Sequence, residues 1–209
     1  MRAVIKYARS GAASFISHLD MQRAFARALR RAELPVQYSE GFNPHILTSF
    51  ASPLSVGIAT QGDYLEVRLT EDVPGDGIRD ALNAVLPQEL RIVFAGALRE
   101  DCPKLMAISH SALYELTFEK EPQALGILAG SGPCIVQDRK SREIDLKAMV
   151  LNLQAEGSIV RAQLANSSAA ALNPIVLARS LGGGEARITR LECFCQVGGQ
   201  VIPYEKLGR

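Results

Sequence analysis

Tryptophan is absent from the sequence, and histidine and cysteine are scarce, with three and four residues in a chain of 209. Four cysteines in a chain of this length do not make a disulfide framework. No apolar run approaches the roughly 20 residues that cross a bilayer. Arg2, Lys6 and Arg9 interrupt the first segment, so it is not a signal peptide. We therefore expect a cytoplasmic protein with reduced thiols and no membrane association.

The motifs of several enzyme classes are also absent. There is no phosphate-binding P-loop, no dinucleotide fingerprint and no nucleophile elbow. Cys193 and Cys195 fall on one side of a predicted strand, but no matching Cys/His pair completes the four ligands of a metal site. We interpret these two cysteines as small buried residues, and we expect neither a metal nor a cofactor.

Charge is balanced over the whole chain and uneven along it. The formal net charge is +1, so no global field attracts the protein to nucleic acid or to a membrane. Residues 1–50 hold seven Lys/Arg against three Asp/Glu, whereas residues 51–100 hold four against eight. The first quarter of the chain is therefore locally basic.

Hydrophobic periodicity predicts alternating strands and helices in both halves of the chain. In the first half we expect a half-buried strand at 1–7, strands at 47–60 and 63–69 joined by the turn TQGD, a strand at 90–98, and helices at 17–34 and 76–86. In the second half we expect strands at 112–118, 133–138, 144–154, 158–165 and 187–197, and helices at 122–130 and 173–182. Asn173 and Pro174 suit the start of the last helix, and Gly182 suits its end.

This order of elements predicts the α+β fold class. We expect two tandem ferredoxin-like (βαββαβ) halves with antiparallel sheets. The N-terminal domain is placed at residues 1–105 and the C-terminal domain at 106–209.

The first predicted helix carries four arginines and no lysine. Its apolar face is formed by residues at helical spacing, namely Leu19, Phe25, Ala28, Leu29 and Ala32. Its opposite face carries Arg23, Arg27 and Arg30, with Arg31 beside them, which together are a donor surface for phosphate or carboxylate. The alternative is a solvated face whose arginines pair with acidic residues from 63–80.

The segment SHLD at the start of this helix contains a histidine and an aspartate. Ser17 is a good N-cap, and Asp20 in the first turn complements the helix dipole. Helix capping is therefore the favoured interpretation of Ser17 and Asp20. For His18, a functional role stays open as an alternative.

The stretch YSEGFNPH, residues 38–45, has the composition of a binding loop. Gly41 and Pro44 shape its backbone, and between them Phe42 and Asn43 would be displayed. With Tyr38 and His45 at the margins, the loop offers groups that stack on a base and hydrogen-bond to it. The alternative is that Phe42 fills the core beneath the loop and Asn43 makes a local turn.

The region around these motifs resembles the radical-SAM-linked family, a bacterial domain of unknown function found beside or fused to radical SAM proteins. The matching motifs are SHLD (17–20), RR (30–31), LPVQYSEGFNPH (34–45) and SPLSVG (52–57). The resemblance implies a radical SAM protein as partner and an RNA-related substrate such as tRNA or rRNA. The chain has no CxxxCxxC for a radical SAM cluster, so it is not itself that catalyst.

Three functions are compatible with these observations. The first is an accessory RNA-binding protein in tRNA or rRNA maturation or modification, with Arg23, Arg27, Arg30 and Arg31 on phosphates and the loop on bases. The second is a module that docks on a radical SAM enzyme without contacting RNA. The third is a metal-independent RNA nuclease that uses His18 or His45 as acid or base. The ligand and the oligomeric state stay open.

Overall fold

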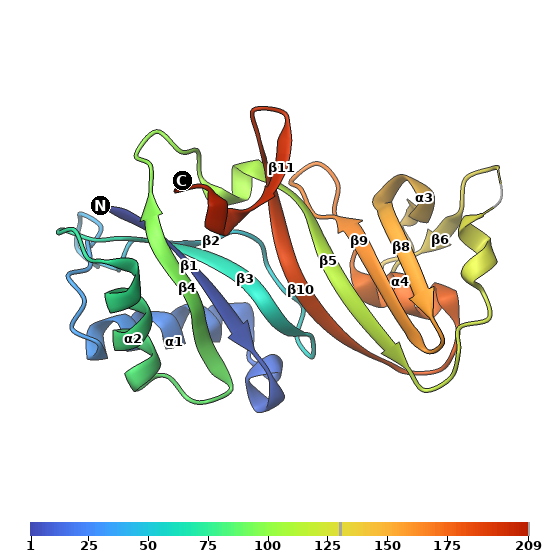
Figure 1. Ribbon diagram of the computed structural model, residues 1–209, viewed down its shortest axis with the longest axis horizontal. Coiled ribbons are helices and arrows are strands. Elements are labelled where there is room, and N and C mark those ends of the chain that lie inside the picture. The colour runs from blue at the N-terminus through green and yellow to red at the C-terminus, as the bar shows by residue number, and fades with distance from the viewer. Residues whose placement is uncertain (130, 209) are drawn as a thin grey trace.

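A computed structural model describes residues 1–129 and 131–208, and most of its strands join in one sheet (Figure 1). The strands of this sheet are β1 (Arg2–Arg9), β2 (Thr48–Phe50), β3 (Ala59–Arg68), β4 (Leu90–Leu98), β5 (Ser109–Phe118), β8 (Val150–Glu156), β9 (Ile159–Ala165), β10 (Ala186–Val197) and β11 (Gln200–Pro203). β6 (Ile135–Gln137) and β7 (Glu143–Asp145) form a second, small sheet. The α-helices are α1 (His18–Arg31), α2 (Gly75–Val85), α3 (Leu146–Met149) and α4 (Pro174–Leu181). Short 3-10 helices occur at η1 (Gly11–Phe15), η2 (Leu105–Ile108), η3 (Leu125–Leu128) and η4 (Tyr204–Lys206).

The large sheet has nine strands and contains strands from both halves of the sequence. Its order is β4-β1-β3-β10-β5-β9-β8, with β2 paired to β3 and β11 paired to β10. The pairings are antiparallel except where β10 runs parallel to β3, at Ala59 with Thr189 and Thr60 with Arg190. The α+β class is confirmed, but two tandem ferredoxin-like halves with their own sheets are not confirmed. The division into domains at residue 105 stays a prediction.

Elements with strong periodicity and clear end signals lie where they are expected. α2, β4, β9 and β10 match their predicted segments within a few residues. α4 begins at Pro174 after the N-cap Asn173, whose side chain accepts a hydrogen bond from the Ile175 amide at 3.0 Å. It ends at Gly182, which has a φ of +71°. Within the described residues, no helix is long and apolar enough to cross a membrane.

Four predicted details are wrong. β3 runs without a break through the expected TQGD turn, and residues 51–58 before it are a loop rather than a strand. The helix expected at 122–130 is a single 3-10 turn over its described part, and its residue 130 lies outside the described residues. The strand expected at 144–154 is divided into β7, α3 and β8, and the short β11 was not predicted.

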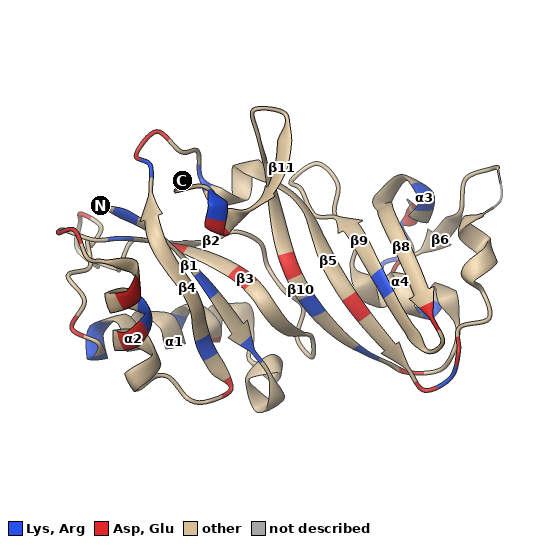
Figure 2. Ribbon diagram, in the orientation of Figure 1, with Lys and Arg blue, Asp and Glu red and all other residues tan. Residues whose placement is uncertain are grey.

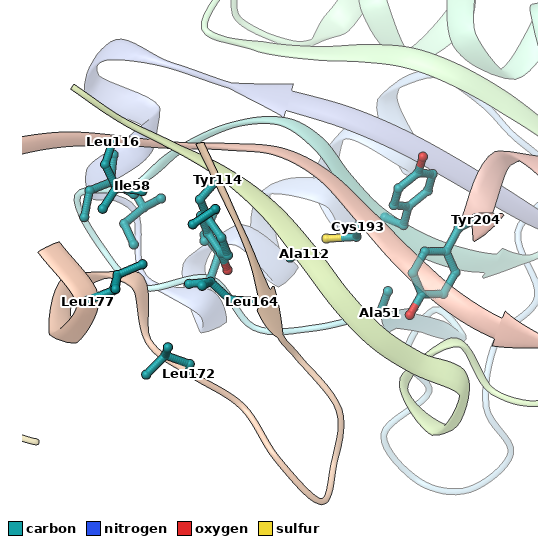
Figure 3. Close-up of a cluster of buried hydrophobic side chains, with 14 of the residues drawn as sticks. Ala51, Ile58, Ala112, Tyr114, Leu116, Leu164, Leu172, Leu177, Cys193 and Tyr204 are labelled. Carbon is teal, nitrogen blue, oxygen red and sulfur yellow. The ribbon is translucent and has the colours of Figure 1, made fainter. Parts of the chain in front are cut away.

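Two groups of buried side chains form the core. One lies between α1, α2 and the strands β1, β3 and β4, and includes Ile5, Phe25 and Leu82. The other packs α4 against β5, β9 and β10, and continues between the two halves to Val4 and Tyr204 (Figure 3). β1 is therefore buried on both faces, not half-buried as expected, because η4 covers the face opposite α1.

Candidate functional site

α1 presents its arginines to solvent because its apolar face is bound to the sheet. The Ser17 side chain accepts a hydrogen bond from the Asp20 amide at 3.2 Å, which confirms the N-cap. The buried side chains of the helix are Met21, Phe25, Ala28 and Leu29. All four arginines are exposed, and Figure 2 marks the Lys and Arg positions of the chain in blue, including those on α1. The predicted segregation of apolar and basic faces is confirmed, except that Met21 rather than Leu19 belongs to the buried face.

The four arginines differ in how they are held. Arg23 pairs with Asp20 at 2.9 Å across the exposed surface, and hydrogen bonds from Ser17 and then Arg23 lower the pKa of Asp20. Arg31 donates a hydrogen bond to the Val85 carbonyl of α2 at 2.7 Å.

The guanidinium groups of Arg27 and Arg30 have no hydrogen-bond or ion-pair partner among residues 1–129 and 131–208. The expected alternative, pairing with acidic residues from 63–80, does not occur. These two guanidinium groups are therefore available for an anionic ligand.

The YSEGFNPH stretch is a small hairpin rather than a loose loop. Tyr38 and Ile46 form an antiparallel bridge, and the Ser39 amide donates to the His45 carbonyl at 2.8 Å. The Ser39 hydroxyl lies 2.8 Å from His45 Nδ1 and accepts from the His45 amide at 3.1 Å. These bonds fix the base of the hairpin and orient the imidazole.

The tip of the hairpin displays an aromatic ring. Gly41 has a φ of +111°, a conformation that favours glycine, and it lies in open space. The Phe42 side chain beside it has a relative exposure of 105%, so the interpretation of Phe42 as a core residue is wrong. Asn43 is also exposed. The Phe42 ring therefore contributes nothing to the core.

The hairpin and α1 belong to the same side of the molecule. Ile46 at the hairpin base and Val36 before it are buried in the same cluster as Phe25 and Leu29 of α1. Because bridged residues of an antiparallel pair point the same way, Tyr38 lies on the α1 side with Ile46. The α1 helix and the base of the hairpin therefore pack on the same face of the sheet.

The histidines are not brought together by any contact among the described residues. The His18 ring packs edge-on against Phe50, with centroids 5.2 Å apart, and its Nε2 lies 3.2 Å from Gln22 Nε2. His45 is held by Ser39 instead. Each therefore has a local structural partner.

Three exposed apolar residues were missed by sequence reasoning. Leu19 was assigned to the buried face of the helix but is 63% exposed, because Met21 rather than Leu19 is in register with Phe25 and Leu29. Phe15 is 71% exposed, and Val56 in the SPLSVG loop is 52% exposed. A Cβ placed on Gly57 would lie 3.9 Å from the Phe15 ring, so the loop and η1 are neighbours.

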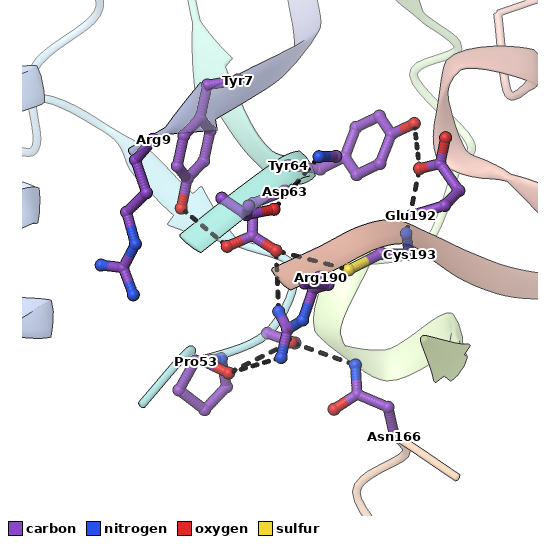
Figure 4. Close-up of polar contacts among 12 residues, drawn as sticks. Tyr7, Arg9, Pro53, Asp63, Tyr64, Asn166, Arg190, Glu192 and Cys193 are labelled. Carbon is purple, nitrogen blue, oxygen red and sulfur yellow. Dashed lines mark hydrogen bonds and ion pairs between the residues drawn. The ribbon is translucent and has the colours of Figure 1, made fainter. Parts of the chain in front are cut away.

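A buried polar network holds the SPLSVG loop (Figure 4). Arg190 of β10 pairs with Asp63 of β3 at 2.7 Å and donates to the Tyr114 hydroxyl at 2.7 and 2.9 Å. The same guanidinium donates to the Ser52 hydroxyl at 3.0 Å and to the Pro53 carbonyl at 3.2 Å. One buried cation therefore fixes both the seam between β3 and β10 and the start of the loop.

Burial and the neighbouring charges shift the pKa values of these groups in opposite directions. Burial, the largest single influence, lowers the pKa of Arg190, but the charge and hydrogen bond of Asp63 together with Tyr114 and Cys193 outweigh it, so the net pKa is raised. Burial raises the pKa of Tyr114 to about 12. Burial also raises the pKa of the Cys193 thiol well above its usual range. Cys193 and Cys195 are both buried, as predicted, and Cys193 stays protonated and unreactive.

Comparison with family models gives one finding that decides the classification. Residues 2–174 match the model described as "Uncharacterized protein conserved in bacteria (DUF2344)". The chain belongs to this family. A comparison with curated proteins finds no match.

The DUF2344 match covers the surface described above. α1, the hairpin and the SPLSVG loop all lie within residues 2–174, as does Asp63. Its end at Pro174 leaves out Arg190, the partner of Asp63. The matched region extends beyond the expected boundary at residue 105.

Proposed function

We propose that this DUF2344 protein is an accessory RNA-binding protein, which acts with a radical SAM protein in the maturation or modification of tRNA or rRNA. The observation that carries the proposal is the solvated ring of Phe42, in a hairpin whose base packs on the same face of the sheet as α1, which bears the unpaired Arg27 and Arg30. Aromatic rings that stack on bases and cations that hold phosphates are the two components of single-strand recognition.

Each group has a distinct role in this proposal. Arg27 and Arg30 bind phosphates, which positions the RNA without reading its sequence. Phe42 stacks on an unpaired base, while Asn43 and Tyr38 hydrogen-bond to base edges or ribose. Arg23, Arg31 and His45 are already engaged with Asp20, Val85 and Ser39, so they contribute less.

The near-zero net charge is compatible with this function because the cations are concentrated. The formal charge of +1 gives no long-range attraction. Binding therefore depends on the local surface, and loss of two cations from it should have a large effect.

The radical SAM partner is supported by resemblance of the SHLD, YSEGFNPH and SPLSVG motifs to the radical-SAM-linked family. The chain itself has no CxxxCxxC, so the chemistry would reside in the partner. In this arrangement the present chain supplies RNA affinity.

The experiment is a titration of the purified protein with total tRNA and with rRNA fragments at low and high salt. Arg27→Ala/Arg30→Ala should abolish most of the binding. Arg139→Ala/Lys140→Ala removes two exposed cations from a distant loop and should leave binding unchanged. Failure of the wild-type protein to bind either RNA would refute the proposal.

A second candidate is favoured by the exposed apolar residues. Phe15 and Val56 lie next to a hollow of about 380 Å³ between the SPLSVG loop and α4, whose lining includes Ile175 and Arg179. Exposed apolar groups beside a hollow suit a protein interface. If Phe15→Ser/Val56→Ser weakened capture of a radical SAM protein while RNA binding was absent in the wild type, the chain would be a docking module.

A further inference from the structure

The two edges of the large sheet are protected to different degrees. At the β4 edge, the Asn83 side chain of α2 accepts a hydrogen bond from the Ile92 amide at 2.8 Å and donates to its carbonyl at 3.0 Å. Gly75 and Gly208 lie so close to the carbonyls of Ala95 and Ala97 that a Cβ on either would clash with them. The β4 edge is therefore closed to another strand.

At the other end of the sheet, no further strand among the described residues pairs with β8, which is the last strand of the order (Figure 1). Within residues 1–129 and 131–208, residues 152–156 form inter-strand pairs only with β9. They contain neither lysine nor proline, two residues that commonly block edge pairing. Most of the strand is exposed, including Leu151 at 47%. A regular, exposed edge of this kind is a template for a further strand.

The register of the β8–β9 hairpin shows which backbone groups are free. Glu156 pairs with Ile159 across a two-residue turn, and Gln154 and Asn152 pair with Arg161 and Gln163. In an antiparallel hairpin with a two-residue turn these are the hydrogen-bonded pairs, and alternate residues direct their N–H and C=O groups outward. The outward groups therefore belong to Leu153 and Ala155.

We propose that β8 pairs antiparallel with β8 of a second copy of this chain, around a twofold axis at Gln154. This register lets Leu153 and Ala155 of one copy exchange hydrogen bonds with Ala155 and Leu153 of the other. It uses the regular residues 152–156 and leaves out the irregularity between Val150 and Asn152.

The strand is complementary to itself in this register. Gln154 faces its own copy, so two amides meet and can exchange hydrogen bonds. Asn152 faces Glu156 of the other copy, and an amide N–H donates to a carboxylate. No like charges oppose each other, since Glu156 is the one charged residue in the segment. Self-complementarity is what an isologous interface requires.

Two consequences follow from the geometry. Antiparallel edge pairing places the twofold axis perpendicular to the sheet, so the α1 helices of both copies lie on the same side at the two far ends. Five residues in each strand bury less area than a standard interface, so we expect a weak dimer with a dissociation constant on the order of 1–100 µM.

The test is sedimentation of the full chain over concentrations up to about 1 mM. Asn152→Glu opposes Glu156 of the other copy at two symmetric positions, and should weaken the dimer roughly tenfold. Asn152→Lys creates two opposite-charge pairs and should strengthen it. The double variant Asn152→Glu/Glu156→Lys restores complementarity and should dimerise again.

Both substituted positions are exposed, so unfolding does not confuse the result. A wild-type chain that stays monomeric over the whole range would overturn the proposal. A dimer that responds equally to Asn152→Glu and Asn152→Lys would also overturn it, because the interface would then lie elsewhere. Neither result depends on RNA binding.

Discussion

Arg190 and Asp63 form an ion pair of 2.7 Å in which only 3% of each side chain is exposed. The pair joins β10 to β3 next to the parallel pairing that connects the two halves of the sequence. The remaining hydrogen bonds of Arg190 go to Tyr114, Ser52 and Pro53, so this residue holds the start of the SPLSVG loop. The position of this loop therefore depends on the seam between the halves.

Asp63→Asn should destabilise the protein strongly. It leaves the buried guanidinium of Arg190 without a counter-charge, which costs about 3–5 kcal/mol. The free energy of unfolding in urea measures the loss. The control is Glu115→Gln, which breaks the more exposed Glu115–Arg161 pair and should cost about 1 kcal/mol or less. Equal effects of the two substitutions would contradict the role given to the buried pair.

Stability should fall at alkaline pH through Tyr114. Its pKa is raised from 10.0 to about 12 because burial disfavours the phenolate. A raised folded-state pKa gives stability that is complete below the unfolded pKa and is lost as pH rises, here between about 10 and 12. Over that interval Tyr114 contributes a slope of about −1.4 kcal/mol per pH unit.

The measurement is the free energy of unfolding across this interval for the wild type and for Tyr114→Phe. The variant lacks the titrating hydroxyl, so its stability should decrease less steeply by about that slope. Parallel curves for the two proteins would show that Tyr114 does not titrate differently in the folded state.

Gly62→Ala should destabilise the seam between β3 and β10. A Cβ at this position would lie 2.6 Å from the Leu191 carbonyl and 3.0 Å from Glu192 Cα, both of which are backbone atoms. The strands must separate to accept it, at about 1–3 kcal/mol. Thermal unfolding detects the change. Gly126→Ala is the matched control, since nothing lies within 4 Å of its Cβ.

Phe42→Ala should affect RNA binding and not stability. The ring is fully exposed, so the free energy of unfolding should change by about 0.5 kcal/mol or less. Loss of one stacked base weakens binding by about 1–3 kcal/mol, or roughly five- to 150-fold. Fluorescence anisotropy with a labelled tRNA fragment measures it. If stability fell and affinity did not, Phe42 would be a structural residue after all.

The parts of the fold that the sequence predicted have local causes. α2 and β4 were found because apolar spacing and Pro87 define them within a short segment, and α4 because Asn173, Pro174 and Gly182 mark its ends. TQGD was misread because Gly62 looks like a turn residue, whereas it allows β10 to approach β3. The residues that require a glycine at position 62, Leu191 and Glu192, lie more than a hundred positions away in the sequence.

Part of the candidate site was also predictable from local sequence patterns. Exposure of the arginines and of Phe42 follows from the helical period and from the glycine and proline of the hairpin. The pairing of Arg190 with Asp63 was not predictable, because a buried ion pair between distant strands leaves no local pattern. The exposure of Phe15 and Val56 was not predictable either, because phenylalanine and valine are residue types that are usually buried in the core.

The most direct test of the central proposal is the salt dependence of RNA affinity. The logarithm of the binding constant should fall linearly with the logarithm of salt concentration, with a slope proportional to the number of phosphates bound. Arg27→Ala/Arg30→Ala should reduce the magnitude of this slope by about 1.4 for a single-stranded RNA, whereas Arg139→Ala/Lys140→Ala should leave it unchanged. The same slope in all three proteins, or no binding by the wild type, would contradict a phosphate-binding role for α1.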